Sequence, residues 1–192
     1  MALILLDYGH GGVDPGAVYK GRKESNDVLC IGRNVAQELR RHGVTVDETR
    51  TADREVSLKE RARMELRKNY LYFISFHRNA FKPEQANGAE TFVWTNPTDK
   101  ANVLAGRIQR SMVAVGFRDR GVKRANFFVL RETRSPAVLI EVGFIDNSKD
   151  NEIIDMKKAA IVTGISGAIL SHLKDEKSLI KTERVKKCDC GC

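Results

Sequence analysis

Three apolar segments of the chain each carry, at or near their end, a side chain that can bind a metal ion or transfer a proton. The segments and side chains are Ala2–Leu6 with His10, Leu71–Phe76 with His77, and Pro136–Phe144 with Glu141. Continuous aliphatic and β-branched runs of this length are typical of strands buried on both faces. A carboxylate in such a strand is costly to bury unless it is neutralised, paired or close to a cation. Because sites in open α/β sheets form at the carboxyl ends of the strands, we expect these three side chains to meet.

Glu24 completes a set of residues that could form a zinc site. Catalytic zinc takes three protein ligands and a water, and two histidines with one glutamate are a known ligand set. Zinc lowers the pKa of that water to about 7 and polarises a scissile carbonyl. In this scheme His10, Glu24 and His77 bind the metal, and Glu141 transfers a proton from the water to a leaving amine.

Each of these residues also has an ordinary structural explanation. A histidine at a strand end often only forms hydrogen bonds, Glu24 is favourable at the start of a helix, and Glu141 could pair with an arginine. The chain contains no H-E-x-x-H, which excludes the common zinc-protease helix. The glycine-rich segment 9–17 has the spacing of neither common nucleotide-binding loop. Residue types alone therefore leave the metal site and the structural explanation both open.

Periodicity and capping signals predict the elements that position these residues. Helices are expected over 24–41, 57–68 and 96–116, and again from 148 to about 174, with a break at Gly164 or Gly167. Strands are expected over 2–8, 44–46, 71–76, 88–94, 126–130 and 136–144, with a turn over 119–123. This alternation predicts a three-layer α/β fold, in which helices flank a mainly parallel sheet of about six strands.

Length and composition predict one globular domain and a tail. The chain has 192 residues, 42% of them hydrophobic, which suits a single domain over residues 1–174. Residues 175–192 lose the hydrophobic periodicity and are predicted to form a flexible basic tail. Cys188, Cys190 and Cys192 in this tail do not have the C-x-x-C spacing of zinc sites. They could bind a soft metal or cross-link chains, but a solvated tail is favoured.

The formal net charge of +8 indicates a basic surface, on which Arg61, Arg63 and Arg67 are expected to be solvated. Attraction to an anionic polymer is the alternative. No basic helix, zinc finger or aromatic-plus-basic strand motif points to nucleic acid, so no nucleic-acid partner is expected. No apolar run approaches the ~20 residues that cross a bilayer, which predicts no membrane insertion. The oligomeric state has no signal in the sequence.

A series of short segments, in order along the chain, resembles the zinc-dependent N-acetylmuramoyl-L-alanine amidases of the type 3 muramoyl amidase family. The segments are DYGHGGVDPGA at 7–17, Glu24, RTAD at 50–53, VSL at 56–58, SFHRNA at 75–80, GAET at 88–91, RGVK at 120–123 and PAVLIEVGFIDN at 136–147. They cover nearly everything from residue 2 to about 173. The whole series is specific, although any one segment alone is a weak signal.

The resemblance implies a zinc ion held by His10, Glu24 and His77, with Glu141 as the catalytic carboxylate. It implies that zinc-activated water hydrolyses the amide between the lactyl group of N-acetylmuramic acid and the L-alanine of the stem peptide in peptidoglycan. Two other functions are compatible with the same fold: a cell-wall-binding protein, and a zinc peptidase that cuts within stem peptides.

The resemblance also carries expectations about where the protein acts. The first strand follows Met1 directly, so we expect no signal peptide. Synthesis in the cytoplasm, release by a holin-type route and action on the cell wall are expected, as for a bacteriolytic phage endolysin.

Several residues near the expected site could bind substrate. Asn79 is expected to contact it from the segment that contains His77. Arg78 stands where small residues are frequent in the family, and we expect it either to alter the substrate groove or to contact an anionic carboxylate of the stem peptide. The cationic side chains that precede Glu24 would favour an acidic substrate in the same way; they are Lys20, Arg22 and Lys23.

Overall fold

The computed structural model describes residues 2–189, with side chains as far as Glu176. The strands are β1 (Leu3–Tyr8), β2 (Val18–Tyr19), β3 (Arg22–Lys23), β4 (Thr45–Glu48), β5 (Tyr72–Asn79), β6 (Ala89–Val93), β7 (Asp119–Arg124) and β8 (Ala137–Phe144). The helices are α1 (Glu24–Arg41), α2 (Leu58–Glu65), α3 (Asp99–Val115), α4 (Phe128–Arg131) and α5 (Ser148–Asp189). β2 and β3 form a small antiparallel hairpin apart from the main sheet.

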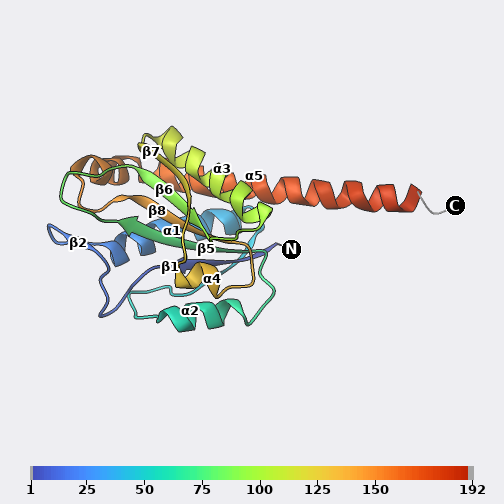
Figure 1. Ribbon diagram of the computed structural model, residues 1–192, viewed down its shortest axis with the longest axis horizontal. Helices are drawn as coiled ribbons and strands as arrows, with labels where there is room; N and C mark the ends of the chain where they lie inside the picture. Colours follow the sequence, from blue (N-terminus) through green and yellow to red (C-terminus); the bar gives the residue numbers. More distant parts are fainter. Residues whose placement is uncertain (1, 190–192) are drawn as a thin grey trace.

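The main sheet has six strands in the order β4-β1-β5-β8-β6-β7 (Figure 1). β4, β1, β5 and β8 are parallel, whereas β6 runs antiparallel to β8 and β7 runs parallel to β6. The predicted three-layer α/β fold with a mainly parallel sheet is confirmed. The carboxyl ends of β1, β5 and β8, three adjacent strands, therefore lie at the same edge of the sheet.

Helices cover both faces of the sheet and bury a hydrophobic core on each side. α1, α3 and α5 pack on one face over residues such as Leu6 and Ile74. α2 and α4 lie on the other face, over Leu5 and Phe73 (Figure 1). Successive residues of one strand thus enter different cores. This burial on both faces is the reason why the central strands are continuous apolar runs in the sequence.

Two secondary-structure predictions for the segment between β6 and β8 are wrong. Residues 119–123, predicted as a turn, lie in the edge strand β7, and residues 126–130, predicted as a strand, contain the start of the short helix α4. β7 is charged and largely exposed, so it lacks the apolar alternation that would have marked it as a strand. Val129 and Leu130 are neighbours that enter the same core. One helical turn permits this, whereas side chains of a strand alternate between faces.

The break expected at Gly164 or Gly167 in α5 is also wrong. The non-helical residue is Lys157, with φ −123° and ψ 24°. Its Nζ donates a hydrogen bond of 2.9 Å to the carbonyl oxygen of Val115, the last residue of α3. Gly164 and Gly167 lie within helical backbone, and the kink of α5 lies where Lys157 is bonded to the end of α3.

α5 continues beyond the predicted end at about residue 174, as far as Asp189. The backbone of 175–189 is therefore helical; this stretch contains no glycine or proline and many good helix formers. That residues 175–192 form a flexible basic tail stays a prediction. Figure 1 shows this end of α5 projecting from the body of the protein. Cys190 and Cys192 lie outside the described residues. Within the described range, no helix is both long and apolar enough to cross a membrane.

Candidate metal and catalytic site

The side chains of His10, Glu24 and His77 meet at the carboxyl edge of the parallel strands. The Nε2 atom of His10 lies 3.2 Å from Oε1 of Glu24, and Nδ1 of His77 lies 2.9 Å from the same oxygen. The centroids of the two imidazole rings are 5.1 Å apart. One ligand-type atom from each residue lies within 4.8 Å of the others, so one ion could reach all three.

Local backbone geometry places each of these residues. His77 lies near the carboxyl end of β5, and Glu24 is the first residue of α1. His10 follows β1 in a left-handed conformation with φ 59°. The Glu24 carboxylate also accepts hydrogen bonds from the backbone N–H groups of Ala17 (2.9 Å) and Arg78 (3.0 Å). The two imidazoles and these two backbone N–H groups together hold the buried carboxylate of Glu24 in place.

Asp14 is a site residue that the sequence analysis did not identify. Its Oδ2 lies 2.8 Å from Nδ1 of His10, on the opposite side of the ring from Glu24. A carboxylate at this nitrogen orients the imidazole and leaves Nε2 free to bind a metal. The four-residue spacing between His10 and Asp14 within one glycine-rich loop was the signal in the sequence.

The ionisation of the three residues is strongly coupled. Burial alone would raise the pKa of Glu24, but hydrogen bonds from His10 and His77 hold it well below its usual range. Burial alone would lower the pKa of His10, yet Glu24 and Asp14 raise it to about 9. The pKa of His77 is raised as well, through Glu24 and Glu141, against the effect of burial. Both imidazoles are thus biased towards their protonated forms beside the Glu24 carboxylate, and a bound cation would replace those protons.

Glu141 lies beside this group on β8. In the sheet it is the register partner of His77 on one side and of Glu90 on the other. Its Oε2 atom is buried without a hydrogen-bond partner. Burial raises the pKa of Glu141 to about 7, and the charges of Glu24 and Glu90 act in the same direction against the His77 charge. A carboxyl group with such a pKa can both accept and donate a proton near neutral pH.

Asn79 belongs to a polar cluster around Glu90. Its Nδ2 donates to Glu90, which also accepts from Lys123 and, at 2.9 Å, from Nε of Arg120. Glu90, Arg120 and Lys123 had no role predicted from the sequence, although all three lie in segments that carry the family resemblance. Contact between Asn79 and the substrate stays a prediction.

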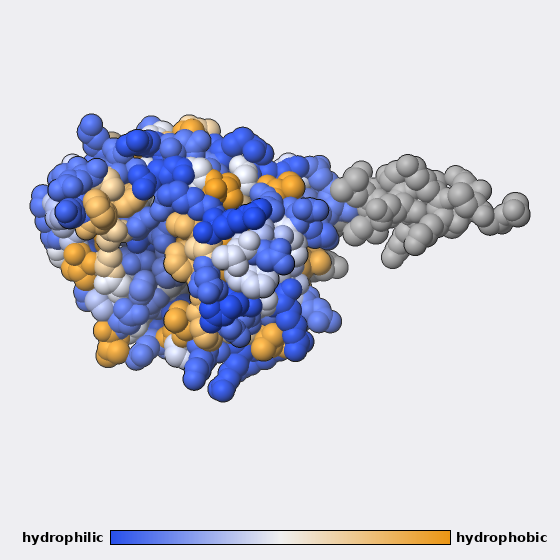
Figure 2. Space-filling view, in the orientation of Figure 1, coloured by the Kyte–Doolittle hydropathy of each residue, from blue (hydrophilic) through white to orange (hydrophobic). Residues whose placement is uncertain are grey.

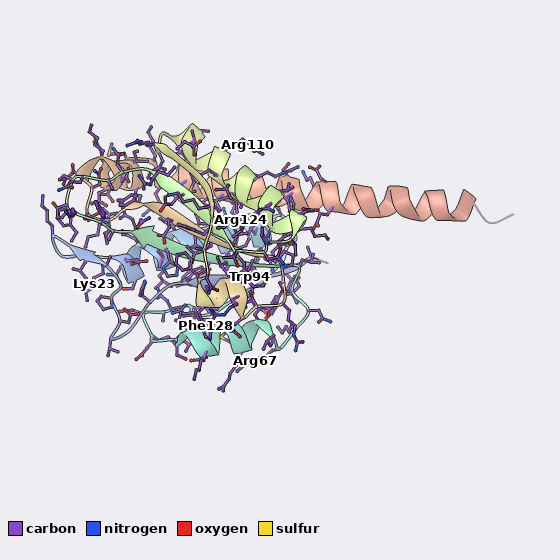
Figure 3. The ribbon with its side chains drawn as sticks, viewed as in Figure 1. Lys23, Arg67, Trp94, Arg110, Arg124 and Phe128 are labelled. Carbon is purple, nitrogen blue, oxygen red and sulfur yellow. The ribbon has the colours of Figure 1, made fainter. Side chains whose placement is uncertain are left out.

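The prediction that Arg78 binds substrate is contradicted by its burial. Its side chain is 0% exposed and pairs with Asp27 at 2.5 Å. Arg22 is likewise engaged, because it pairs with Asp27 at 2.7 Å and with Asp155 at 2.8 Å. Lys23, by contrast, is exposed at the end of the small hairpin (Figure 3).

Arg61 is a second cation that the sequence analysis placed wrongly on the surface. It is 2% exposed and donates to Oδ1 of Asp7 (2.6 Å) and to the carbonyl oxygens of Tyr8 (2.6 Å) and His10 (2.8 Å). It therefore supports the loop that carries His10. The exposure expected for Arg63 and Arg67 is confirmed, on a surface that Figure 2 shows to be mainly hydrophilic.

A family model described as N-acetylmuramoyl-L-alanine amidase matches residues 4–171 of the chain. The chain belongs to the N-acetylmuramoyl-L-alanine amidase family. The matched range begins in β1, ends within α5 and includes every residue of the site described above.

Relatives of this amidase include bacterial proteins of different lengths. The uncharacterised protein YqiI of Bacillus subtilis is 35% identical over 170 residues, which cover 84% of this chain and 82% of YqiI. The N-acetylmuramoyl-L-alanine amidase LytC of the same organism is 36% identical over 149 residues, which are 77% of this chain and 30% of LytC. The crystal structure of an N-acetylmuramoyl-L-alanine amidase from Clostridium difficile 630 superimposes with a TM-score of 0.86 at 35% identity, covering 90% of this chain and 97% of that one.

Gly16 packs directly against two of the candidate ligands. It has φ 66°, and a Cβ atom there would lie 2.6 Å from both Oε2 of Glu24 and Cδ2 of His10. Gly16→Ala is therefore expected to displace these candidate ligands and to weaken metal binding about 10-fold to 100-fold, measured with added zinc by competition with a chelator. Gly21→Ala is the matched control, because Gly21 also has a positive φ (80°) but nothing within 4 Å of its added Cβ. Equal zinc affinities for the two variants would refute the steric argument.

Proposed function

We propose that this amidase hydrolyses the bond between the lactyl group of N-acetylmuramic acid and the L-alanine of the stem peptide, with a zinc ion bound by His10, Glu24 and His77. The observation that carries this proposal is the arrangement of the site. Three ligand-type atoms surround one point, next to a glutamate, Glu141, whose buried oxygen has no hydrogen-bond partner. Membership of the amidase family indicates the substrate class.

The residues fit a zinc ion. Two imidazoles and one carboxylate form a ligand set of catalytic zinc, which keeps a fourth position for water or substrate. Asp14 bonds the ring nitrogen of His10 that faces away from Glu24, as carboxylates commonly do at zinc-binding histidines. The backbone N–H groups of Ala17 and Arg78 hold the Glu24 carboxylate in place in the same way.

A bound zinc ion would lower the pKa of water and polarise the scissile carbonyl. The contribution of the chain itself is proton transfer at Glu141. Its carboxylate accepts a proton from the attacking water and passes it to the nitrogen of the departing L-alanine. The amide C–N bond breaks, and the products are the free lactyl carboxylic acid and a stem peptide with a new amine. Burial, which raises the pKa of Glu141, suits a group that must first accept and then donate a proton.

The bond that is cleaved can be identified by mass analysis of digested peptidoglycan. Purified cell walls treated with the protein are expected to release intact stem peptides that begin with a free L-alanine amine. Treatment with a chelator is expected to stop this release, and added zinc to restore it. Cuts within the stem peptides would instead identify a peptidase. Sedimentation with the walls without any product would identify a wall-binding protein, and either result would overturn the proposal.

The proposed place of action is the cell wall, because peptidoglycan is the proposed substrate. Release by a holin-type route, as for a phage endolysin, stays a prediction. This prediction is tested by comparing lysis of intact cells by protein added from outside with lysis after permeabilisation of the membrane.

A further inference from the structure

The strand that carries Glu141 contains an irregularity directly after that residue. His77 faces Glu141 in the ladder between β5 and β8, but the next pair skips one residue of β8. Val142 and Gly143 therefore oppose the single residue Arg78 of β5. Such a bulge bends the strand and leaves the extra residue out of the regular ladder. Gly143 has φ 72°, which side chains rarely permit. The position of Glu141 thus depends on what holds this bulge.

Arg78 holds the bulge from the interior of the protein. Its Nε donates to the carbonyl oxygen of Val142 (3.1 Å) and its Nη2 to that of Phe144 (2.9 Å), one on each side of Gly143. Its Nη1 lies 2.5 Å from Oδ2 of Asp27, in the first turn of α1. The side chain is 0% exposed, so these charge-assisted hydrogen bonds do not compete with solvent.

The same residue is connected to the candidate metal ligand on α1. The backbone N–H of Arg78 donates to Oε1 of Glu24 at 3.0 Å. Asp27, which receives the guanidinium, lies three residues after Glu24 on the same helix. Asp27 is itself fixed by Arg22, which is bound to Asp155 of α5. One buried guanidinium therefore joins β5, α1 and β8, the three elements that carry His77, Glu24 and Glu141.

On the basis of the function proposed above, we propose that Arg78 is a positioning residue. Its guanidinium sets the distance between Glu141 and the metal ligands by holding the bulge of β8 against the first turn of α1. The planar fork of arginine is needed for this, because it directs donors to two carbonyl oxygens and a carboxylate at once. Arg78 thus acts on the reaction through the backbone of β8 and makes no contact with substrate.

Two variants distinguish the role of the hydrogen-bond geometry of the Arg78 guanidinium from the role of its charge. Arg78→Met keeps much of the volume without any donor, and Arg78→Lys keeps a charge for Asp27 but cannot bridge Val142 and Phe144. Both are expected to lower kcat on a soluble muramoyl-peptide about 10-fold or more, because small misplacements of reacting groups are costly, with KM changed less than about 2-fold. In the metal-free protein, hydrogen exchange of the amides at 142–144 is expected to be faster by about 10-fold.

Glu65 offers a matched control at the other end of the same strand. It is 1% exposed and accepts hydrogen bonds from the backbone N–H groups of Arg134 (3.1 Å) and Ser135 (2.9 Å), just before β8. Glu65→Met therefore also removes a buried charged group that bridges two main-chain groups. It is expected to lower the melting temperature while leaving kcat, measured well below that temperature, within about 2-fold of the unmodified protein.

The outcomes distinguish positioning from stability alone. Equal losses of kcat in the Arg78 and Glu65 variants, or an Arg78→Met protein with kcat within 2-fold of the unmodified one, would overturn the proposal. If Arg78→Met does not fold, Arg78→Lys provides the same comparison. If the unmodified protein releases no L-alanine amine, the proposed function fails. The hydrogen-exchange measurement then still decides whether Arg78 holds the bulge.

Discussion

Glu141→Gln is expected to lower kcat for peptidoglycan hydrolysis by a factor of about 10² to 10⁴, the range of general acid–base catalysis. Glutamine keeps the size of the side chain and its place between His77 and Glu90 in the sheet. It cannot take the proton of the attacking water. Because Glu141 lies beside the candidate ligands and is not one of them, the variant is expected to retain one zinc per chain. Loss of turbidity of purified walls, with the metal content measured on the same sample, is the experiment.

Two comparisons make this result specific. Glu132→Gln changes an exposed glutamate and should leave the rate unchanged. His77→Ala should lose both zinc and activity, because it removes an expected ligand. If Glu141→Gln retained more than about a tenth of the activity, proton transfer would have to be assigned to another residue.

Asp7→Asn is expected to have the largest effect on stability, a loss of about 3 to 5 kcal/mol in the free energy of unfolding. Asp7 is 0% exposed and pairs with Arg61 at 2.6 Å, while Ser75 and Thr49 donate to it at 2.6 Å and 2.8 Å. The substitution leaves the buried guanidinium of Arg61 without its counter-charge. Denaturant unfolding followed by circular dichroism measures the difference. Asp47→Asn is the control, because its partner Lys68 is largely exposed and the pair should contribute about 0 to 1 kcal/mol.

The contribution of Asp7 to the free energy of unfolding should also decrease as the pH falls. Burial alone raises the pKa of Asp7, but the Arg61 charge and the hydrogen bonds from Ser75, Arg61 and Thr49 outweigh it and lower the pKa below its ordinary value. A carboxyl group whose pKa is lower in the folded state stabilises the fold above its unfolded pKa, about 3.9, and loses this effect as the pH falls towards the folded value. The difference between Asp7→Asn and the unmodified protein should therefore shrink below about pH 4. A difference that stayed constant there would mean that the charge of Asp7 is not what stabilises the fold.

The parts of the fold that follow local rules could be predicted from the sequence. α1 occupies 24–41 as expected, and the hydroxyl of Ser57 caps α2 by accepting from the backbone N–H of Glu60 at 3.2 Å. The central strands were recognisable because burial on both faces leaves a continuous apolar run. β7 and α4 were missed for the opposite reason: an edge strand and a single helical turn carry too few buried residues to make a pattern.

Strand pattern and residue type were enough to predict that His10, His77 and Glu141 lie together, because the carboxyl ends of adjacent parallel strands share one edge of the sheet. The burial of the cations around them became visible only in the folded protein. Arg61 was expected in solvent and Arg78 against the substrate, yet both are buried. Their burial depends on carboxylates and carbonyl oxygens contributed by distant strands and helices, such as Asp7 for Arg61 and Asp27 for Arg78. Charge compensation of this kind is a property of three-dimensional neighbours, and no periodicity along the chain encodes it.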